Sequence, residues 1–123
     1  MTRLLRSLAG GALLTLVTVL GDAHAHLDSS VPADGSHLAT LPANLVLTFS
    51  EPARLTVLWI EKDGDKPGDK QKVSALPTAT ARQLSVPLPR LAPGAYHITF
   101  RTLSADGHVA PGELRFTLGP SQQ

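Results

Sequence analysis

The segment Tyr96-His97-Ile98-Thr99-Phe100-Arg101 decides the fold class, because apolar and polar side chains alternate along it residue by residue. Such alternation puts every second side chain on one face, as in a β-strand with one buried side. The pattern recurs at residues 45–49, 84–88 and 113–118, and turn signals such as Pro93-Gly94 separate the segments. With six or seven short strands and no helical period, we predict an all-β fold, a small antiparallel Greek-key sandwich or barrel.

Residues 55–60 are apolar at both odd and even positions apart from Thr56. This pattern predicts a central strand that is covered on both faces, with Trp59 in the core. The segment Ser50-Glu51-Pro52 is expected to end the strand before it. The stretch 61–72, rich in lysine, aspartate and glycine, is expected to form a solvated hairpin loop.

The beginning of the chain has the composition of a secretory signal peptide. Arg3 and Arg6 form a basic start, residues 8–20 are apolar apart from threonine and glycine, and Ala23-His24-Ala25 fits the small-x-small cleavage pattern. The apolar run is shorter than the about 20 residues that a membrane-spanning helix needs. We therefore predict an exported protein; an uncleaved N-terminal anchor is the alternative.

Cleavage after Ala25 divides the chain into a signal peptide at residues 1–25 and one β domain at residues 26–123. The domain then begins with His26, and its formal charge falls from +1 to zero. A second small-x-small pattern, Gly21-Asp22-Ala23, would start the chain two residues earlier. His26 would then stand third behind a terminal amine, where it can bind copper or nickel together with backbone nitrogens.

The composition excludes several classes of protein. A processed chain without net charge, only 4% aromatic over its full length, has no basic surface for nucleic acid. The chain contains no cysteine, which excludes disulfides and thiolate metal sites such as blue copper. Its one methionine is Met1, which leaves with the signal peptide, so thioether ligands for Cu(I) are excluded as well.

Two stretches far apart in the sequence carry metal-binding chemistry. At a processed N-terminus, His26 offers both its α-amine and its imidazole Nδ1 to one ion. The stretch from Ser104 to His108 places Asp106 and His108 two residues apart, on one face if the segment is extended. Three nitrogens and one oxygen in a roughly square arrangement suit Cu(II) better than zinc or calcium. We predict His26, Asp106 and His108 as the ligands, with binding that weakens in mild acid because the nitrogens must be deprotonated.

Each part of this prediction has a plainer interpretation when it is taken alone. An Asp-x-His triplet in a loop is often incidental, and so is a histidine after a signal site. Their conjunction in an exported, cysteine-free, strand-rich chain is what points to a metal. Glu51, at the end of an apolar strand, can be simply solvated, or it can orient a ligand from outside the metal's coordination sphere. His37 and His97 are expected at the surface.

Five segments of the processed chain occur in an order that is known from one protein family. They are His26-Leu27 through Ser30-Val31-Pro32-Ala33-Asp34-Gly35-Ser36, Leu47-Thr48-Phe49-Ser50-Glu51-Pro52, Pro93-Gly94-Ala95-Tyr96, Ser104-Ala105-Asp106-Gly107-His108-Val109 and Gly112-Glu113-Leu114-Arg115-Phe116. On these segments the sequence resembles the CopC family of periplasmic copper-resistance proteins. The resemblance covers nearly the whole processed chain and is far more specific than an Asp-x-His triplet.

The resemblance implies an immunoglobulin-like Greek-key fold that holds Cu(II) at its N-terminus. His26 would give an amine and an imidazole, Asp106 an oxygen and His108 an imidazole, with Glu51 near the site. It also implies a periplasmic copper carrier, in some members acting beside CopD, an inner-membrane protein implicated in copper uptake. The methionine-rich loop that some members use for Cu(I) is missing here, so we expect a single Cu(II) site in a monomer.

Three functions compete on this sequence. Our first expectation is a protein without enzymatic activity that sequesters or delivers Cu(II). The enzymatic rival is a histidine-brace oxygenase, similar to the lytic polysaccharide monooxygenases, which also use an N-terminal histidine but need exposed aromatic area for a polymer. The third is a metal-free immunoglobulin-like interaction domain, whose melting temperature would not respond to copper.

Overall fold

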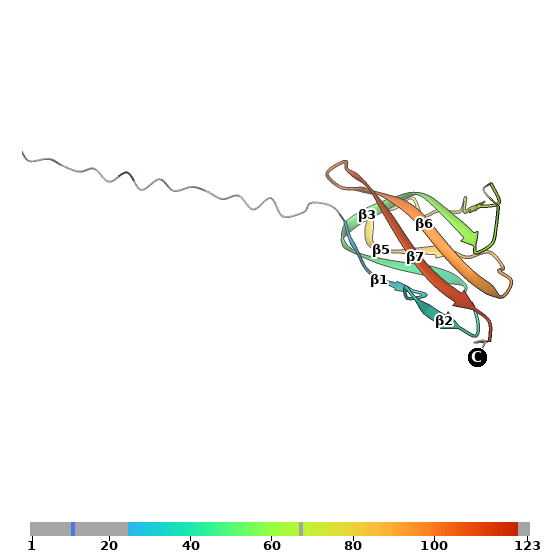
Figure 1. Ribbon diagram of the computed structural model, residues 1–123. Coiled ribbons are helices and arrows are strands. Elements are labelled where there is room, and N and C mark those ends of the chain that lie inside the picture. Colours follow the sequence, from blue (N-terminus) through green and yellow to red (C-terminus); the bar gives the residue numbers. More distant parts are fainter. Residues whose placement is uncertain (1–10, 12–24, 67, 121–123) are drawn as a thin grey trace, which may run out of the picture.

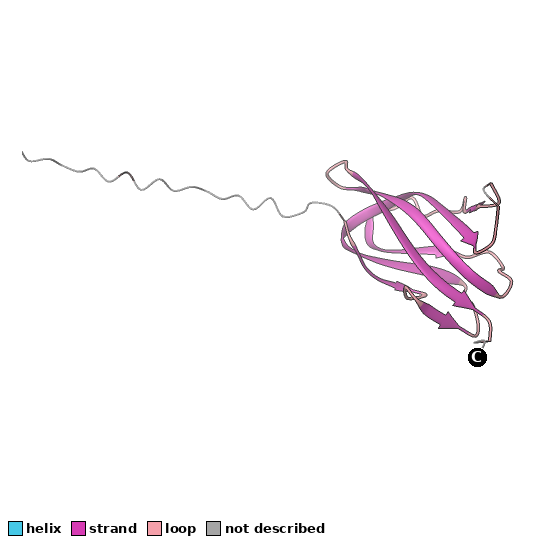
Figure 2. Cartoon of the chain, viewed as in Figure 1, coloured by secondary structure: helices cyan, strands magenta, loops and turns pink. Residues whose placement is uncertain are grey.

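The computed structural model describes residues 11, 25–66 and 68–120, and in these residues it contains strands and loops but no helix (Figure 2). The predicted all-β class is confirmed. The predicted signal peptide at 1–25 lies outside the described residues, except for Gly11 and Ala25. In the described ranges nothing helical is long and apolar enough to span a membrane. The strands are β1 (Leu27–Val31), β2 (Ser36–Leu38), β3 (Asn44–Lys62), β4 (Gln71–Lys72), β5 (Ala81–Pro87), β6 (Gly94–Ser104) and β7 (Val109–Leu118).

The long strand β3 joins the two halves of the fold. Its first half pairs with β1 and β5, and its second half pairs with β4 and β6. β6 continues to β7, and β7 pairs in parallel with β2, the one exception to antiparallel pairing among the described strands. Figure 1 shows β3 bending between these two groups of strands. The sheet therefore curls around a single core, as the immunoglobulin-like prediction requires.

The prediction that a strand ends at Ser50-Glu51-Pro52 was wrong, because β3 continues through this segment and bends there. The ladder between β3 and β5 has no residue pair between Thr48 and Ala53, where the register shifts. A proline lacks the N–H that a regular ladder needs, so it is tolerated at irregular positions. Pro52 lies at such a position, and the strand changes partner there without ending.

The core is built by the inward members of each alternating strand, as the sequence pattern predicts. Phe49 from the first half of β3 meets Phe100 from β6 edge to face, with ring centroids 6.1 Å apart, and thereby connects the two halves. The Tyr96 ring stacks on Phe116 at 5.5 Å. Fully buried apolar side chains, each at most 1% exposed, include Leu45, Leu47, Leu58, Val86, Ile98 and Leu114.

Tyr96 fastens the start of β6 to the preceding loop. Its hydroxyl donates to the carbonyl oxygen of Ala92, four residues upstream. Burial raises the pKa of the Tyr96 phenol, and the charge of Asp65 adds to the effect. Immunoglobulin-like sandwiches use a tyrosine near the start of a strand in the same way.

The strand at residues 55–60 is not covered on both faces, which corrects the sequence prediction. Leu58 and Ile60 are buried, but Thr56 is exposed and Val57 and Trp59 are only half-buried. The apolar run misled the prediction because Val57 and Trp59 lie on the outer face of the sheet. Trp59 is therefore not a core residue.

Candidate metal centre

The turn between β6 and β7 is organised by the carboxylate of Asp106. The hydroxyl of Ser104 donates to Asp106 Oδ1, and the backbone N–H of His108 donates to the same oxygen at 3.2 Å. The turn is closed by backbone bonds from Gly107 N to Ser104 O at 3.0 Å and from Ser104 N to His108 O at 2.9 Å. Gly107 has φ +87°, a left-handed conformation that favours glycine. The turn is thus fixed by both side chain and backbone.

The same carboxylate orients the ring of His108. Asp106 Oδ2 lies 2.8 Å from His108 Nδ1. Because an ionised carboxylate only accepts hydrogen bonds, Nδ1 donates this one, and in the neutral ring Nε2 then carries the lone pair. Metal-binding histidines commonly donate their second ring N–H to a carboxylate in this way. The prediction from an extended segment was therefore wrong in one detail, since a turn and not strand alternation brings Asp106 and His108 together.

Hydrogen bonding strengthens the anionic form of Asp106. The Ser104 hydroxyl, then the side chain and the backbone N–H of His108, hold the pKa of this carboxyl well below its usual range. An ionised carboxylate with oriented lone pairs is the form that a divalent cation needs. The 31% exposure of its side chain keeps Asp106 within reach of solvent and of an ion.

His26 is anchored to the bend of β3 by two hydrogen bonds. Its backbone N–H donates to the hydroxyl of Ser50 at 2.9 Å, and the backbone N–H of Ser50 donates to His26 O at 2.8 Å. These bonds extend the pairing of β1 with β3, in which Leu27 lies opposite Phe49. The backbone nitrogen of His26 thus has a defined position, and its residue is exposed.

The two predicted parts of the site lie at the same end of the molecule. Ser104 pairs with Ala53 on β3, and Ser50, which holds His26, is three residues away along the same strand. Three residues of extended chain span about 10 Å. Figure 1 shows the start of β1, the bend of β3 and the β6–β7 turn together, opposite the end of β7.

The described residues do not yet form a complete site. No group of three His, Asp or Glu side chains within 25–66 and 68–120 lies close enough together to hold a metal. The structure brings Asp106 and His108 into contact and places His26 at the same end of the molecule. In this chain the His26 nitrogen is also a peptide nitrogen, so the predicted amine exists only after cleavage.

Two serines belong to this end of the molecule although sequence reasoning did not select them. Ser50 holds the His26 nitrogen and Ser104 holds Asp106. The role of Ser104 has a local signal, since a serine two residues before an aspartate is typical of a side-chain-stabilised turn, whereas the role of Ser50 depends on the pairing of β1 with β3. Glu51 is exposed directly beside Ser50, and its carboxylate makes no hydrogen bond or ion pair with another described residue. Neither interpretation of Glu51 is decided by these contacts.

The remaining described histidines lie elsewhere. His37 is exposed on β2, opposite Thr117 near the end of β7. His97 lies on the outer face of β6, where its Nε2 is 3.0 Å from Glu113 Oε2. His37 is exposed, as predicted, whereas His97 is half-buried, and neither is at the end that carries the β6–β7 turn.

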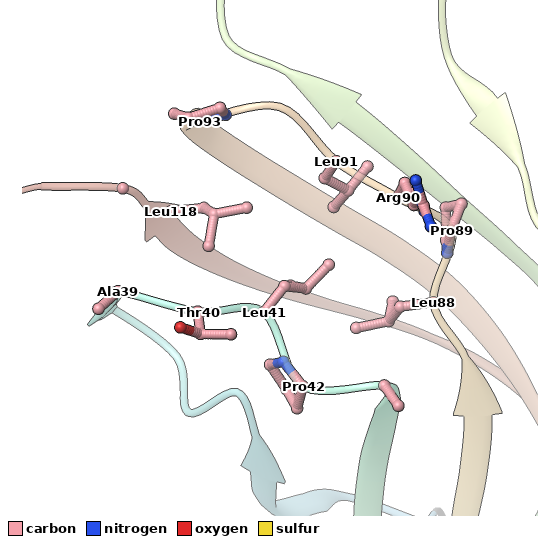
Figure 3. A pocket seen from close by; sticks show the side chains of 12 residues that line it. Ala39, Thr40, Leu41, Pro42, Leu88, Pro89, Arg90, Leu91, Pro93 and Leu118 are labelled. Atoms are coloured by element: carbon pink, nitrogen blue, oxygen red, sulfur yellow. The ribbon is translucent and has the colours of Figure 1, made fainter.

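An apolar hollow of about 490 Å³ lies at the opposite end, between the loop before β3 and the loop before β6 (Figure 3). Leu41, Leu88, Leu91 and Leu118 turn their side chains into it, and Arg90 is the one charged residue in its lining. It offers no donor that a metal ion would prefer. The β6–β7 end therefore remains the candidate metal centre.

Replacing Ser104 with alanine tests the turn. Without the hydroxyl, Asp106 loses a hydrogen bond to Oδ1 and holds His108 less firmly, so we expect copper affinity to fall about tenfold or more, as for other outer partners of metal ligands. A competition titration measures the loss. The matched control is Ser85→Ala at an exposed position on β5, which should leave affinity unchanged. Equal affinity for Ser104→Ala and the unmodified protein would remove Ser104 from the site.

The sequence of this chain is similar to a known protein family and to curated proteins. A family model for the CopC domain matches residues 27–119. Protein YobA of Escherichia coli strain K12 is 32% identical over 114 residues, which cover 87% of this chain and 90% of that protein.

Solved structures agree with the match. CopC from Methylosinus trichosporium OB3b superposes with a TM-score of 0.66 at 30% identity, covering 81% of this chain and 98% of that one. PcoC, a methionine-rich copper resistance protein from Escherichia coli, superposes with a TM-score of 0.58 at 31% identity, covering 77% of this chain and 98% of that one. The fold of this chain is thus similar to that of CopC and to that of PcoC, a copper resistance protein.

Proposed function

Because this chain belongs to the CopC family, we propose that it carries copper, holding one Cu(II) ion that it sequesters or delivers without catalytic turnover. The family match and the copper-resistance structural neighbours support a copper-binding role in copper resistance. The observation that carries the proposal is the 2.8 Å contact between Asp106 and His108, in a turn at the same end of the fold as His26.

The proposed ligands are His26, Asp106 and His108. After cleavage, His26 would supply its terminal amine and its imidazole. His108 would coordinate through an imidazole nitrogen and Asp106 through an oxygen. In the structure Asp106 faces Nδ1, on the side of the ring away from Nε2, so the two side chains would have to separate for both to bind one ion. Glu51 would stand beside the metal without binding it, next to the serine that holds the His26 nitrogen.

The donor set supports the oxidised ion. Nitrogen and carboxylate ligands suit Cu(II), whereas Cu(I) prefers thiolates and thioethers. The chain has no cysteine and one methionine, Met1. It differs in this respect from the methionine-rich PcoC, to which it is similar in fold. We therefore propose a single Cu(II) site without a second site for Cu(I).

The proposal includes export to the periplasm with removal of residues 1–25, and a monomer that passes copper to an inner-membrane partner of the CopD type. Ala25, the last residue before the proposed cut, is buried against the core. The intact mass of the exported protein separates a start at His26 from a start two residues earlier, behind Ala23. Only the first start makes the amine of His26 a ligand.

Thermal unfolding with and without copper tests the function. A ligand that binds only the folded state at a thousandfold excess over its Kd stabilises it by about 4 kcal/mol. We expect Cu(II) to raise the melting temperature of the processed protein, with a much smaller rise for Zn(II). A melting temperature that does not respond to Cu(II) would instead indicate a metal-free interaction domain.

A further inference from the structure

Trp59 stands out on the outer face of the sheet. It is the single tryptophan of the chain, and it lies half-buried between the inward-facing Leu58 and Ile60 on β3. The cross-strand row to which it belongs continues with Thr99 on β6 and Glu113 on β7. A half-exposed indole ring on the outer face of a sheet is a candidate contact for a ligand.

A hollow of about 560 Å³ lies beside this ring. It arises because Thr99 is small and stands between the larger Trp59 and Glu113 in the same row. Arg101 and Pro111, which pair with each other in a neighbouring row, form part of its wall. A volume of about 300–1,000 Å³ is typical of sites for small molecules.

The charges in the hollow favour an anion. The ammonium group of Lys70 lies 5.8 Å from the centroid of the Trp59 ring, within the range of a cation–π contact. Arg101 is exposed in the same lining, and neither cation makes an ion pair with any residue in the described part of the chain. Glu113 is the one carboxylate in the lining, and it is already engaged by His97 at 3.0 Å.

We propose that this hollow binds a small aromatic carboxylate. The ligand's ring would pack against the indole of Trp59 and the ring of Pro111, and its carboxylate would lie between Lys70 and Arg101. Arginine is suited to this because its planar fork can donate two parallel hydrogen bonds to one carboxylate. Offset packing of aromatic rings adds to the affinity beyond the area that is buried.

The hollow is separate from the candidate metal centre. The lining residues nearest to that centre, Arg101 and Pro111, lie three residues from Ser104 and from His108, which is about 10 Å of extended strand. The lining contains none of the proposed copper ligands. A failure of copper binding would therefore leave this proposal intact, and the reverse also holds.

Nuclear magnetic resonance of the protein tests the proposal, because the indole N–H of Trp59 gives a single signal. Benzoate is the probe, benzamide supplies the same ring without the charge, and acetate supplies the charge without the ring. We expect benzoate to shift the Trp59 signal at lower concentrations than either control compound. Equal titrations by benzoate and benzamide, or by benzoate and acetate, would overturn the assignment, as would no shift with any of them.

Substitutions of the two cations test where the carboxylate of benzoate binds. Arg101→Gln should weaken benzoate binding about tenfold, the loss that is typical for one hydrogen bond to a charged group, and leave benzamide unaffected. Lys70→Gln should act in the same direction. Arg82→Gln, at an exposed arginine on β5 that does not line the hollow, is the matched control and should change nothing. Benzoate affinity that is the same in all three variants would contradict the proposed site even if benzoate binds.

Discussion

Adding one alanine in front of His26 in the processed protein will lower its affinity for Cu(II) by about a thousandfold, equivalent to about 4 kcal/mol. The addition turns the terminal amine of His26 into a peptide nitrogen, which can bind copper only after it loses the proton that it donates to Ser50 Oγ. The fold should not change, because the described chain already carries a residue before His26 and still bonds His26 N to Ser50 Oγ at 2.9 Å. A competition titration against a chelator of known affinity measures the loss.

The matched control for this change is one alanine added after Gln123, at the other end of the chain. It adds the same mass and leaves the N-terminus as it was, so copper affinity should equal that of the processed protein. Melting temperatures of both metal-free variants check that the fold is kept. If the N-terminal addition binds Cu(II) as tightly as the control, the amine is not a ligand.

Replacing His108 with alanine will weaken Cu(II) binding by about a hundredfold or more. Loss of a group that hydrogen-bonds a metal ligand already lowers affinity about 10- to 100-fold, and loss of the ligand itself should cost more. The variant removes one imidazole and also leaves Asp106 Oδ2 without the ring that lies 2.8 Å away. Asp106 keeps its bonds from Ser104 and from the backbone of residue 108, so the turn should persist. Isothermal titration of the processed protein measures the change.

His37→Ala is the control for this experiment. His37 is an exposed imidazole on β2, beside the end of β7 and away from the β6–β7 turn. Its removal lowers the histidine count by the same number and should leave the affinity unchanged. Equal losses in the two variants would mean that copper binds to surface histidines in general and not to the proposed site.

Strand alternation was enough to predict most of the fold. The segment from Tyr96 to Arg101 forms the middle of β6, and its apolar members face the core as expected. The two errors have a common origin in β3. Pro52 was predicted to end a strand, but it lies where the register of the β3–β5 ladder shifts. Trp59 was predicted to be a core residue because it continues an apolar run. Which neighbour covers a strand is decided by the whole sheet and is not visible in the strand's own sequence.

The structure bears on the candidate site only through the positions of the predicted residues, which lie at one end of the fold. The sequence contains the Asp106 and His108 pair, and the structure shows their contact through a turn that strand spacing alone did not predict. The role of Ser50 depends on the pairing of two distant segments, so it became visible only in three dimensions, whereas Ser104 acts within its own turn. The ligand set itself stays a prediction, because its amine is produced by cleavage.

Electron paramagnetic resonance of the processed protein with one equivalent of Cu(II) tests the central claim most directly. The account predicts a tetragonal Cu(II) signal with superhyperfine structure from three nitrogens, reduced to two in His108→Ala. A signal without nitrogen coupling, or one that is the same with and without His108, would contradict it.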